Sequence, residues 1–105
     1  MITKHKNAQP RTFLGVDFIL LSHGEKSMVT KMLYKITDNV PKHAHPNEQS
    51  GYVVSGKYRL TFNDFDEVLE TGDSYTIPEN VPHSLEILEA GEVVDVFTPP
   101  REDYL

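Results

Sequence analysis

Residues 41–56 read PKHAHPNEQSGYVVSG and contain two histidines separated by one residue. In a β-strand, residues two apart point to the same face, so His43 and His45 are expected to lie side by side. The same alternation places Gln49 on their face and Glu48 on the opposite one. Pro46 interrupts the stretch and can shift the register, so Glu48 stays open as an alternative third polar partner. Imidazole, amide and carboxylate groups in this order are typical of a metal site.

A second block extends this pattern thirty residues further along the chain. Residues 72–83 read GDSYTIPENVPH, with a glycine at its start, two prolines in a loop and a histidine at its end. Prolines at positions 78 and 82 favour a loop that delivers His83 to the head of the following strand. Histidine pairs also occur as ordinary surface or core residues, so the prediction of a metal site depends on both blocks together.

The rest of the chain predicts β-strands joined by turns. Apolar and polar residues alternate or form short apolar runs bounded by Gly, Asn, Asp and Pro, and no amphipathic helix of useful length is found. We expect a strand at 11–22, a hairpin or bent strand at 51–62, and the remaining strands at 27–37, 74–78, 83–88 and 93–97. Strands at this spacing predict an all-β sandwich or barrel.

Length and composition narrow the possible functions. The 105 residues fit a single domain, with 1–11 as an N-terminal arm and 98–105 as a proline-stiffened tail. A formal net charge of −6 argues against a nucleic-acid partner, and the absence of cysteine excludes disulfides and thiolate ligands. No apolar run is long enough to span a membrane and no signal peptide is recognisable, so a cytoplasmic location is the expectation.

The end of the chain holds a charged residue in an apolar pattern. Asp95 has the same parity as Val93 and Phe97, so its carboxylate is expected to point toward the core or a cavity. A buried unpaired charge is costly and needs either a partner or a function. Arg101 could supply the partner as an ion pair with Asp95. Alternatively, Arg101 and the two acidic residues after it form a solvated tail.

Both histidine blocks resemble the two motifs of the cupin superfamily. HAHPNEQSGYVVSG fits H-x-H-x3-Q-x6-G, and GDSYTIPENVPH fits G-x5-P-x-G-x2-H with Asn80 in place of the usual glycine. Asn accepts the left-handed backbone conformation better than most residues, so this departure is mild. The leading glycine of the first motif is also missing, because Thr37 stands near its place. The resemblance implies an all-β cupin domain, a double-stranded β-helix or jelly-roll barrel.

A closer resemblance is to small cupins that linearise unsaturated uronates in pectin and alginate breakdown. It extends to the ending DVFTPPREDYL at 95–105, so it covers most of residues 41–105. It implies metal ligation by the three histidines and the glutamine, and a substrate pocket lined by Asp95, Phe97 and Arg101. It further implies a homodimer that exchanges N-terminal strands.

A site of this kind would hold a divalent transition metal through His43, His45, Gln49 and His83. All four ligands are neutral, so Ni, Zn, Fe, Cu and Mn suit them about equally and an anionic small-molecule substrate is favoured. Gln49 could instead only form hydrogen bonds inside the barrel. The catalytic candidates are Asp95, as an acid–base group, and Arg101, as a bidentate clamp on a substrate carboxylate.

The function predicted from these resemblances is ring opening and tautomerisation of 4,5-unsaturated uronate monosaccharides. A metal-dependent isomerase of this kind is one of three possibilities. The alternatives are a dioxygenase, which would need a redox metal, and a sugar-binding module without catalytic activity. A transcription regulator is not expected, because no DNA-binding segment is recognisable in this chain.

Overall fold

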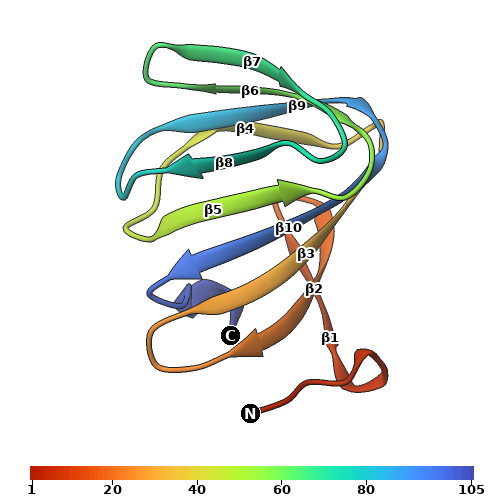
Figure 1. Ribbon diagram of the computed structural model, residues 1–105, viewed down its shortest axis with the longest axis vertical. Helices are drawn as coiled ribbons and strands as arrows, with labels where there is room; N and C mark the ends of the chain where they lie inside the picture. Colours follow the sequence, from red (N-terminus) through yellow and green to blue (C-terminus); the bar gives the residue numbers. More distant parts are fainter.

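The computed structural model describes all 105 residues. It contains ten β-strands and two short 3-10 turns, His5–Asn7 and Glu102–Tyr104 (Figure 1). No helix in it has the length and apolar character needed to cross a bilayer. The strands are β1 Gln9–Phe13, β2 Val16–His23, β3 Met28–Tyr34, β4 Asn39–His43, β5 Glu48–Val53, β6 Lys57–Phe62, β7 Phe65–Leu69, β8 Ser74–Ile77, β9 His83–Glu89 and β10 Gly91–Thr98.

Two antiparallel sheets form the barrel. One has the strand order β1-β2-β3-β10-β5-β8 and the other has the order β4-β9-β6-β7 (Figure 1). Strands that follow each other in sequence therefore often lie in different sheets, as in a jelly roll. The all-β barrel predicted from the strand spacing and from the cupin motifs is confirmed.

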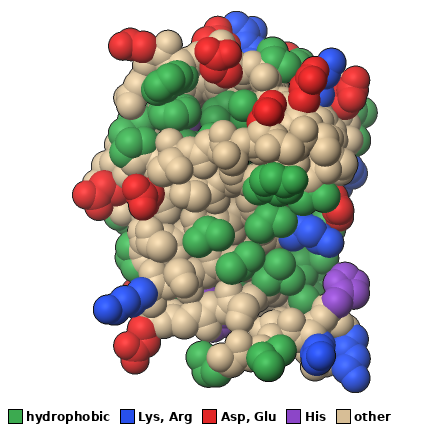
Figure 2. Space-filling view, in the orientation of Figure 1, with side chains coloured by type: hydrophobic (Ala, Val, Ile, Leu, Met, Phe, Trp, Pro, Cys, Tyr) green, Lys and Arg blue, Asp and Glu red, His purple; other side chains and the backbone are tan.

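The core lies between the sheets because inward residues alternate with outward ones. In β3 every second residue, from Met28 to Tyr34, is buried, and in β10 the buried residues are Val93, Asp95 and Phe97. The outer surface carries charges of both signs with apolar side chains between them (Figure 2). The hydrophobic core cluster consists of Val16, Phe18, Leu20, Met28, Met32, Tyr34, Val40, Val53, Tyr58, Leu60, Ile77, Leu85, Ile87, Val93, Phe97 and Tyr104.

One expected strand has a different form in the structure, and one strand of the structure was not expected. The predicted strand at 11–22 is a hairpin, because Leu14 and Gly15 adopt positive φ values of 51° and 80° and turn β1 back onto β2. The prediction was wrong because a leucine at a left-handed position gives no turn signal. Strand β7 was also missed, because its exposed face does not show the alternation of a half-buried strand.

Of the two forms expected for 51–62, the structure shows the chain that bends at Ser55-Gly56 and not the hairpin. Strand β5 belongs to the six-stranded sheet and β6 to the four-stranded one, so the chain bends at Ser55-Gly56 and crosses between sheets. Gly56 has a φ of 92°, which a residue with a Cβ atom adopts only at a cost. A Cβ atom there would also lie 2.5 Å from the Tyr58 hydroxyl oxygen and 2.8 Å from the Glu89 carbonyl oxygen.

Replacing Gly56 by alanine is therefore expected to destabilise the fold by about 2 kcal/mol or more, from backbone strain and steric overlap together. Urea unfolding would measure the loss. Gly24→Ala is the matched control, because a Cβ atom at Gly24 meets no atom within 4 Å and its φ is not positive. Equal stability of Gly56→Ala and Gly24→Ala would contradict this account of the bend.

The C-terminal segment packs back onto the barrel. Arg101 and Tyr104 are buried, which rules out the solvated tail considered for Arg101. Two long-range hydrogen bonds hold the segment in place, from Asn47 Nδ2 to the Pro99 carbonyl oxygen at 2.7 Å and from Arg11 Nε to the Tyr104 carbonyl oxygen at 3.2 Å. The segment therefore forms a wall at one end of the barrel.

Candidate metal centre

Three histidines from separate parts of the chain converge inside the barrel. His43 ends β4, His45 lies in the loop before β5, and His83 begins β9. Strands β4 and β9 are paired, with His43 opposite His83. One ring nitrogen from each histidine lies within 4.8 Å of the others, so the three could hold a metal ion.

The ring orientation of each histidine is fixed by its own backbone. The Nδ1 atoms of His43, His45 and His83 lie 3.0, 2.9 and 2.9 Å from the carbonyl oxygens of Pro41, Asn47 and Val81. Each carbonyl belongs to a residue two positions away in sequence. Because a carbonyl only accepts, Nδ1 carries the proton and Nε2 keeps its lone pair, which is the form that binds metals.

Gln49 adds a fourth group whose geometry fits a cation. Its Oε1 lies 3.1 Å from His45 Nε2. Hydrogen bonding by the same side chain also acts to lower the pKa of the neighbouring Asp95 carboxyl group. With Nδ1 of His45 protonated, Oε1 and Nε2 are both acceptors that face each other, an arrangement that a shared cation stabilises. The residues present therefore fit a divalent metal ion.

Burial favours the neutral form of His45 and His83. Loss of hydration lowers the pKa of His83 to about 4, and the positive charges nearby act in the same direction. The pKa of His45 is also lowered, chiefly by burial and then by the charge of Arg101. Neutral imidazoles at pH 7 have lone pairs available for a metal, so no proton has to leave before binding.

The reasoning from strand parity was only partly correct. His43 and His45 do not share a regular strand, because β4 ends at His43 and His45 lies in the loop. They meet because the loop that contains His45, just before Pro46, turns back toward the barrel. Gln49 lines the inner cavity while Glu48 is exposed on β5, as predicted for the regular strand.

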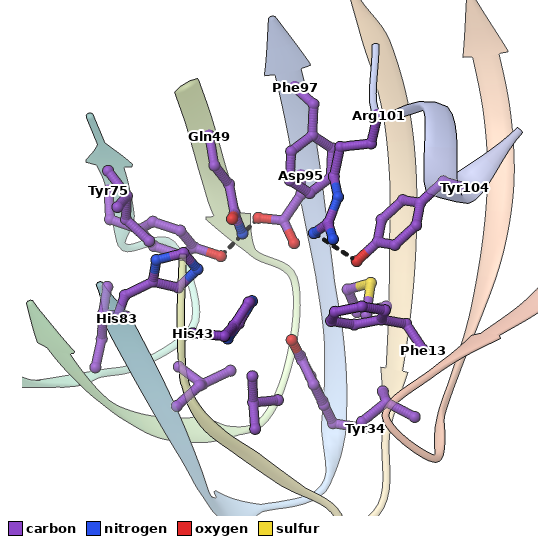
Figure 3. Close-up of a pocket in the computed structure, with 16 residues that line it drawn as sticks. Phe13, Tyr34, His43, Gln49, Tyr75, His83, Asp95, Phe97, Arg101 and Tyr104 are labelled. Atoms are coloured by element: carbon purple, nitrogen blue, oxygen red, sulfur yellow. Dashed lines mark hydrogen bonds between the residues drawn. The ribbon is translucent and has the colours of Figure 1, made fainter. Parts of the chain in front are cut away.

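The cavity next to the histidines is small and mostly apolar (Figure 3). Its free space is about 30 Å³, which is room for an ion with one or two waters. Polar groups enter it from several strands: Gln49 from β5, Tyr75 from β8 and Asp95 from β10. A more open hollow beside it shares Phe13, His43 and Arg101 with this cavity.

Asp95 points into this cavity, as its parity in the sequence predicted. Its side chain is 1% exposed, and burial raises the pKa of its carboxyl group to about 6. Hydrogen bonding by Tyr75 and Gln49 and the charge of Arg101 oppose this rise without cancelling it. A carboxyl group with such a pKa exchanges protons readily near neutral pH.

Arg101 does not form the ion pair with Asp95 that the sequence left open. Its Nε and Nη2 atoms donate to the two carboxylate oxygens of Asp103 at 3.1 and 2.7 Å, and Nη1 donates to the Tyr104 hydroxyl at 2.9 Å. The guanidinium also lies against the rings of Phe13, Phe97 and Tyr104. Three of its five N–H groups are therefore used, and two remain for a ligand.

Several cavity residues were not found from the sequence. Phe13, Tyr34, Tyr75 and Tyr104 all line the cavity, and they come from strands or turns far apart in the chain. Tyr34 falls in the strand expected at 27–37, but nothing marked it as part of a site. Tyr75 lies within the second histidine block, so its position beside the motif was the one available signal.

The molecule is a small barrel of two β-sheets with three converging histidines and a buried carboxyl group. This combination is typical of a small metal-binding domain. Residues 32–97 match the model of the Cupin domain family. This is more than half of the 105 residues, and the chain belongs to that family.

Individual relatives are more distant. The chain superimposes on an RmlC-like cupin from Shewanella frigidimarina with a TM-score of 0.90 and 26% identity, covering 99% of this chain and 95% of the other. For KdgF from a Halomonas species the TM-score is 0.87, with 23% identity and 98% of both chains covered.

A curated relative is longer than this chain. The HTH-type transcriptional regulator PuuR of Escherichia coli is 30% identical over 91 residues, which cover 81% of this chain. The match covers 49% of PuuR, so this chain spans about half the length of that relative.

Proposed function

We propose that this cupin is a metal-dependent enzyme that opens the ring of 4,5-unsaturated uronate monosaccharides. The observation that carries the proposal is the buried Asp95 carboxyl group, which faces the same small cavity as His43, His83 and Gln49. A barrel that only stored or bound a neutral ligand would have no need of a buried carboxyl group with a pKa of about 6. The motif resemblance at residues 41–105 and the full-length likeness in fold to KdgF support the same assignment.

Four neutral groups would hold the metal, namely His43, His45, His83 and Gln49. A divalent ion bound there supplies a Lewis acid that retains its full charge and favours an anionic ligand.

Asp95 is assigned the proton transfers. Ring opening removes the proton from the anomeric hydroxyl group, breaks the bond between C1 and the ring oxygen, and leaves an aldehyde at C1. The electron pair passes to the ring oxygen as an enolate, and a proton added at C4 then gives the ketone at C5. The proton taken from the hydroxyl group can be the one returned at C4, so a single carboxyl group near its pKa serves both steps.

Arg101 and Phe97 are assigned to substrate binding. Because Asp103 occupies the edge formed by Nε and Nη2, a substrate carboxylate would meet the two remaining N–H groups of Arg101. Phe97 packs edge-on against His45, with ring centroids 5.7 Å apart, and forms an apolar wall beside the centre.

An activity assay tests the proposal. The protein would be loaded with Ni, Zn, Mn or Fe and mixed with an unsaturated galacturonate monosaccharide, and the absorbance of the conjugated double bond would be followed against the spontaneous rate. We expect metal-dependent loss of absorbance that is abolished in His45→Ala. Loss at the spontaneous rate with every metal, despite full metal content, would refute the uronate assignment.

The similarity to PuuR favours a second candidate, a cupin module that binds a small ligand without converting it. In that case the metal-loaded protein would bind a uronate, measurable by calorimetry, without changing its absorbance. Oxygen uptake in the same assay would instead indicate the dioxygenase alternative.

A further inference from the structure

Three residues on three neighbouring strands lie in one row across the six-stranded sheet. Tyr75 of β8 is the register partner of Gly51 of β5, and Gly51 is in turn the partner of Asp95 of β10. The two outer residues are two strand spacings apart, roughly 10 Å between backbones. The Tyr75 hydroxyl nevertheless donates to Asp95 Oδ1 at 2.6 Å, so its side chain crosses over Gly51 (Figure 3).

The absence of a side chain at position 51 is what makes this crossing possible. A Cβ atom built on Gly51 would overlap the ring carbons and the hydroxyl oxygen of Tyr75. Gly51 is buried, and its φ is not in the positive region where a turn would require glycine. Glycine is unfavourable in the interior of a strand, and a close approach by another group is the usual reason for it.

The hydrogen bond also sets the orientation of the carboxyl group. Oδ1 of Asp95 is held by Tyr75, and the second oxygen faces the cavity (Figure 3). Tyr75 is a lasting donor, because burial and the charge of Asp95 raise the pKa of its phenol well above the ordinary value. This hydrogen bond is the shortest one made by a side chain that lines the cavity.

We propose that Tyr75 is the positioning residue that aims the Asp95 carboxyl group at the substrate, and that Gly51 is the opening through which Tyr75 reaches it. The proposal rests on the proposed function, in which Asp95 transfers the proton. Gly51 and Tyr75 stand at unspecified positions of H-x-H-x3-Q-x6-G and G-x5-P-x-G-x2-H, so their role follows from the strand register.

Tyr75→Phe tests the proposal, because it removes one hydroxyl group and keeps the ring. We expect kcat to fall about 10- to 100-fold while KM changes less than about twofold, since the lost interaction aligns a proton-transfer group. Metal content should be unchanged. Tyr52→Phe is the matched control, because Tyr52 is the next residue of β5 after Gly51 and its exposed side chain makes no hydrogen bond.

Gly51→Ala gives a second, independent test. The added methyl group should displace the Tyr75 ring and cause a similar fall in kcat. If both changes act through one contact, the double variant Gly51→Ala/Tyr75→Phe should be no slower than the slower of the two single variants. Full kcat in Tyr75→Phe would overturn the proposal, even if Gly51→Ala does not fold.

A measurement without turnover separates this proposal from the proposed function. In the zinc-loaded protein, a short phenol–carboxylate hydrogen bond should give a low-field hydroxyl proton signal in NMR that exchanges slowly. The signal should persist in Tyr52→Phe and disappear in Tyr75→Phe. If the wild type does not convert the uronate, the proposed function fails, and the NMR signal alone tests the contact between Tyr75 and Asp95. Absence of this signal from the wild type would overturn the positioning role.

Discussion

Replacing His83 by alanine is expected to weaken metal binding by at least about 100-fold, because it removes one of three converging ring nitrogens. The two remaining histidines are near each other in sequence, and His83 is the one ligand candidate from the second block. Calorimetric titration with zinc would measure the affinity. Metal should also raise the melting temperature of the wild type and leave that of His83→Ala nearly unchanged.

His23→Ala is the control for this experiment. His23 is an exposed residue at the end of β2, so its removal should leave the zinc affinity of the protein as it is. Zinc bound equally well by His83→Ala and by the wild type would mean that the three histidines are not the metal site. Loss of binding with an unfolded protein is distinguished by circular dichroism.

Replacing Asp95 by asparagine should lower turnover of the uronate by at least about 100-fold, because asparagine cannot take up and return a proton. The amide keeps the size of the side chain and can still accept the Tyr75 hydrogen bond, so metal content should stay the same. Steady-state rates and metal analysis on the same samples would measure both. Equal rates in the variant and the wild type would remove Asp95 from the mechanism.

Asp95→Asn is expected to lower turnover but to raise the stability of the metal-free protein. The folded-state pKa of Asp95, about 6, lies above the ordinary value of 3.8, so the folded protein favours the protonated form. This contribution is present at pH values below 3.8 and is lost as the pH rises through 6. Metal-free Asp95→Asn should therefore become more stable than metal-free wild type between pH 4 and 7, by on the order of 2 kcal/mol. Melting temperatures across this range would detect the crossover, and parallel curves would contradict it.

The sequence predicted the barrel and the inward residues well because both depend on local pattern. Alternation in β10 depends on which face meets the core, and the structure buries Val93, Asp95 and Phe97 as expected. Asn80 adopts a φ of 61°, in agreement with its place where the motif has glycine. The metal candidates were found because their spacing is unusual, and the structure brings all three histidines together.

Features that depend on contacts between distant strands could not be predicted in this way. The partner of Arg101 is Asp103 in its own turn, because the 3-10 turn at 102–104 folds the acid back onto the guanidinium. The crossing of Tyr75 over Gly51 requires the register of three strands, which no single stretch of sequence contains.

The way in which the histidines are held has a consequence for how this protein can evolve. The Nδ1 atom of each imidazole is held by a carbonyl oxygen of its own neighbouring backbone, and only His45 also lies within hydrogen-bond distance of a side chain, that of Gln49. Mutations in the surrounding wall, at positions such as Phe97 or Tyr34, can therefore change the shape and polarity of the cavity while the histidine geometry persists. A domain built in this way can acquire new substrates by small steps, because innovation in the wall does not compete with maintenance of the centre.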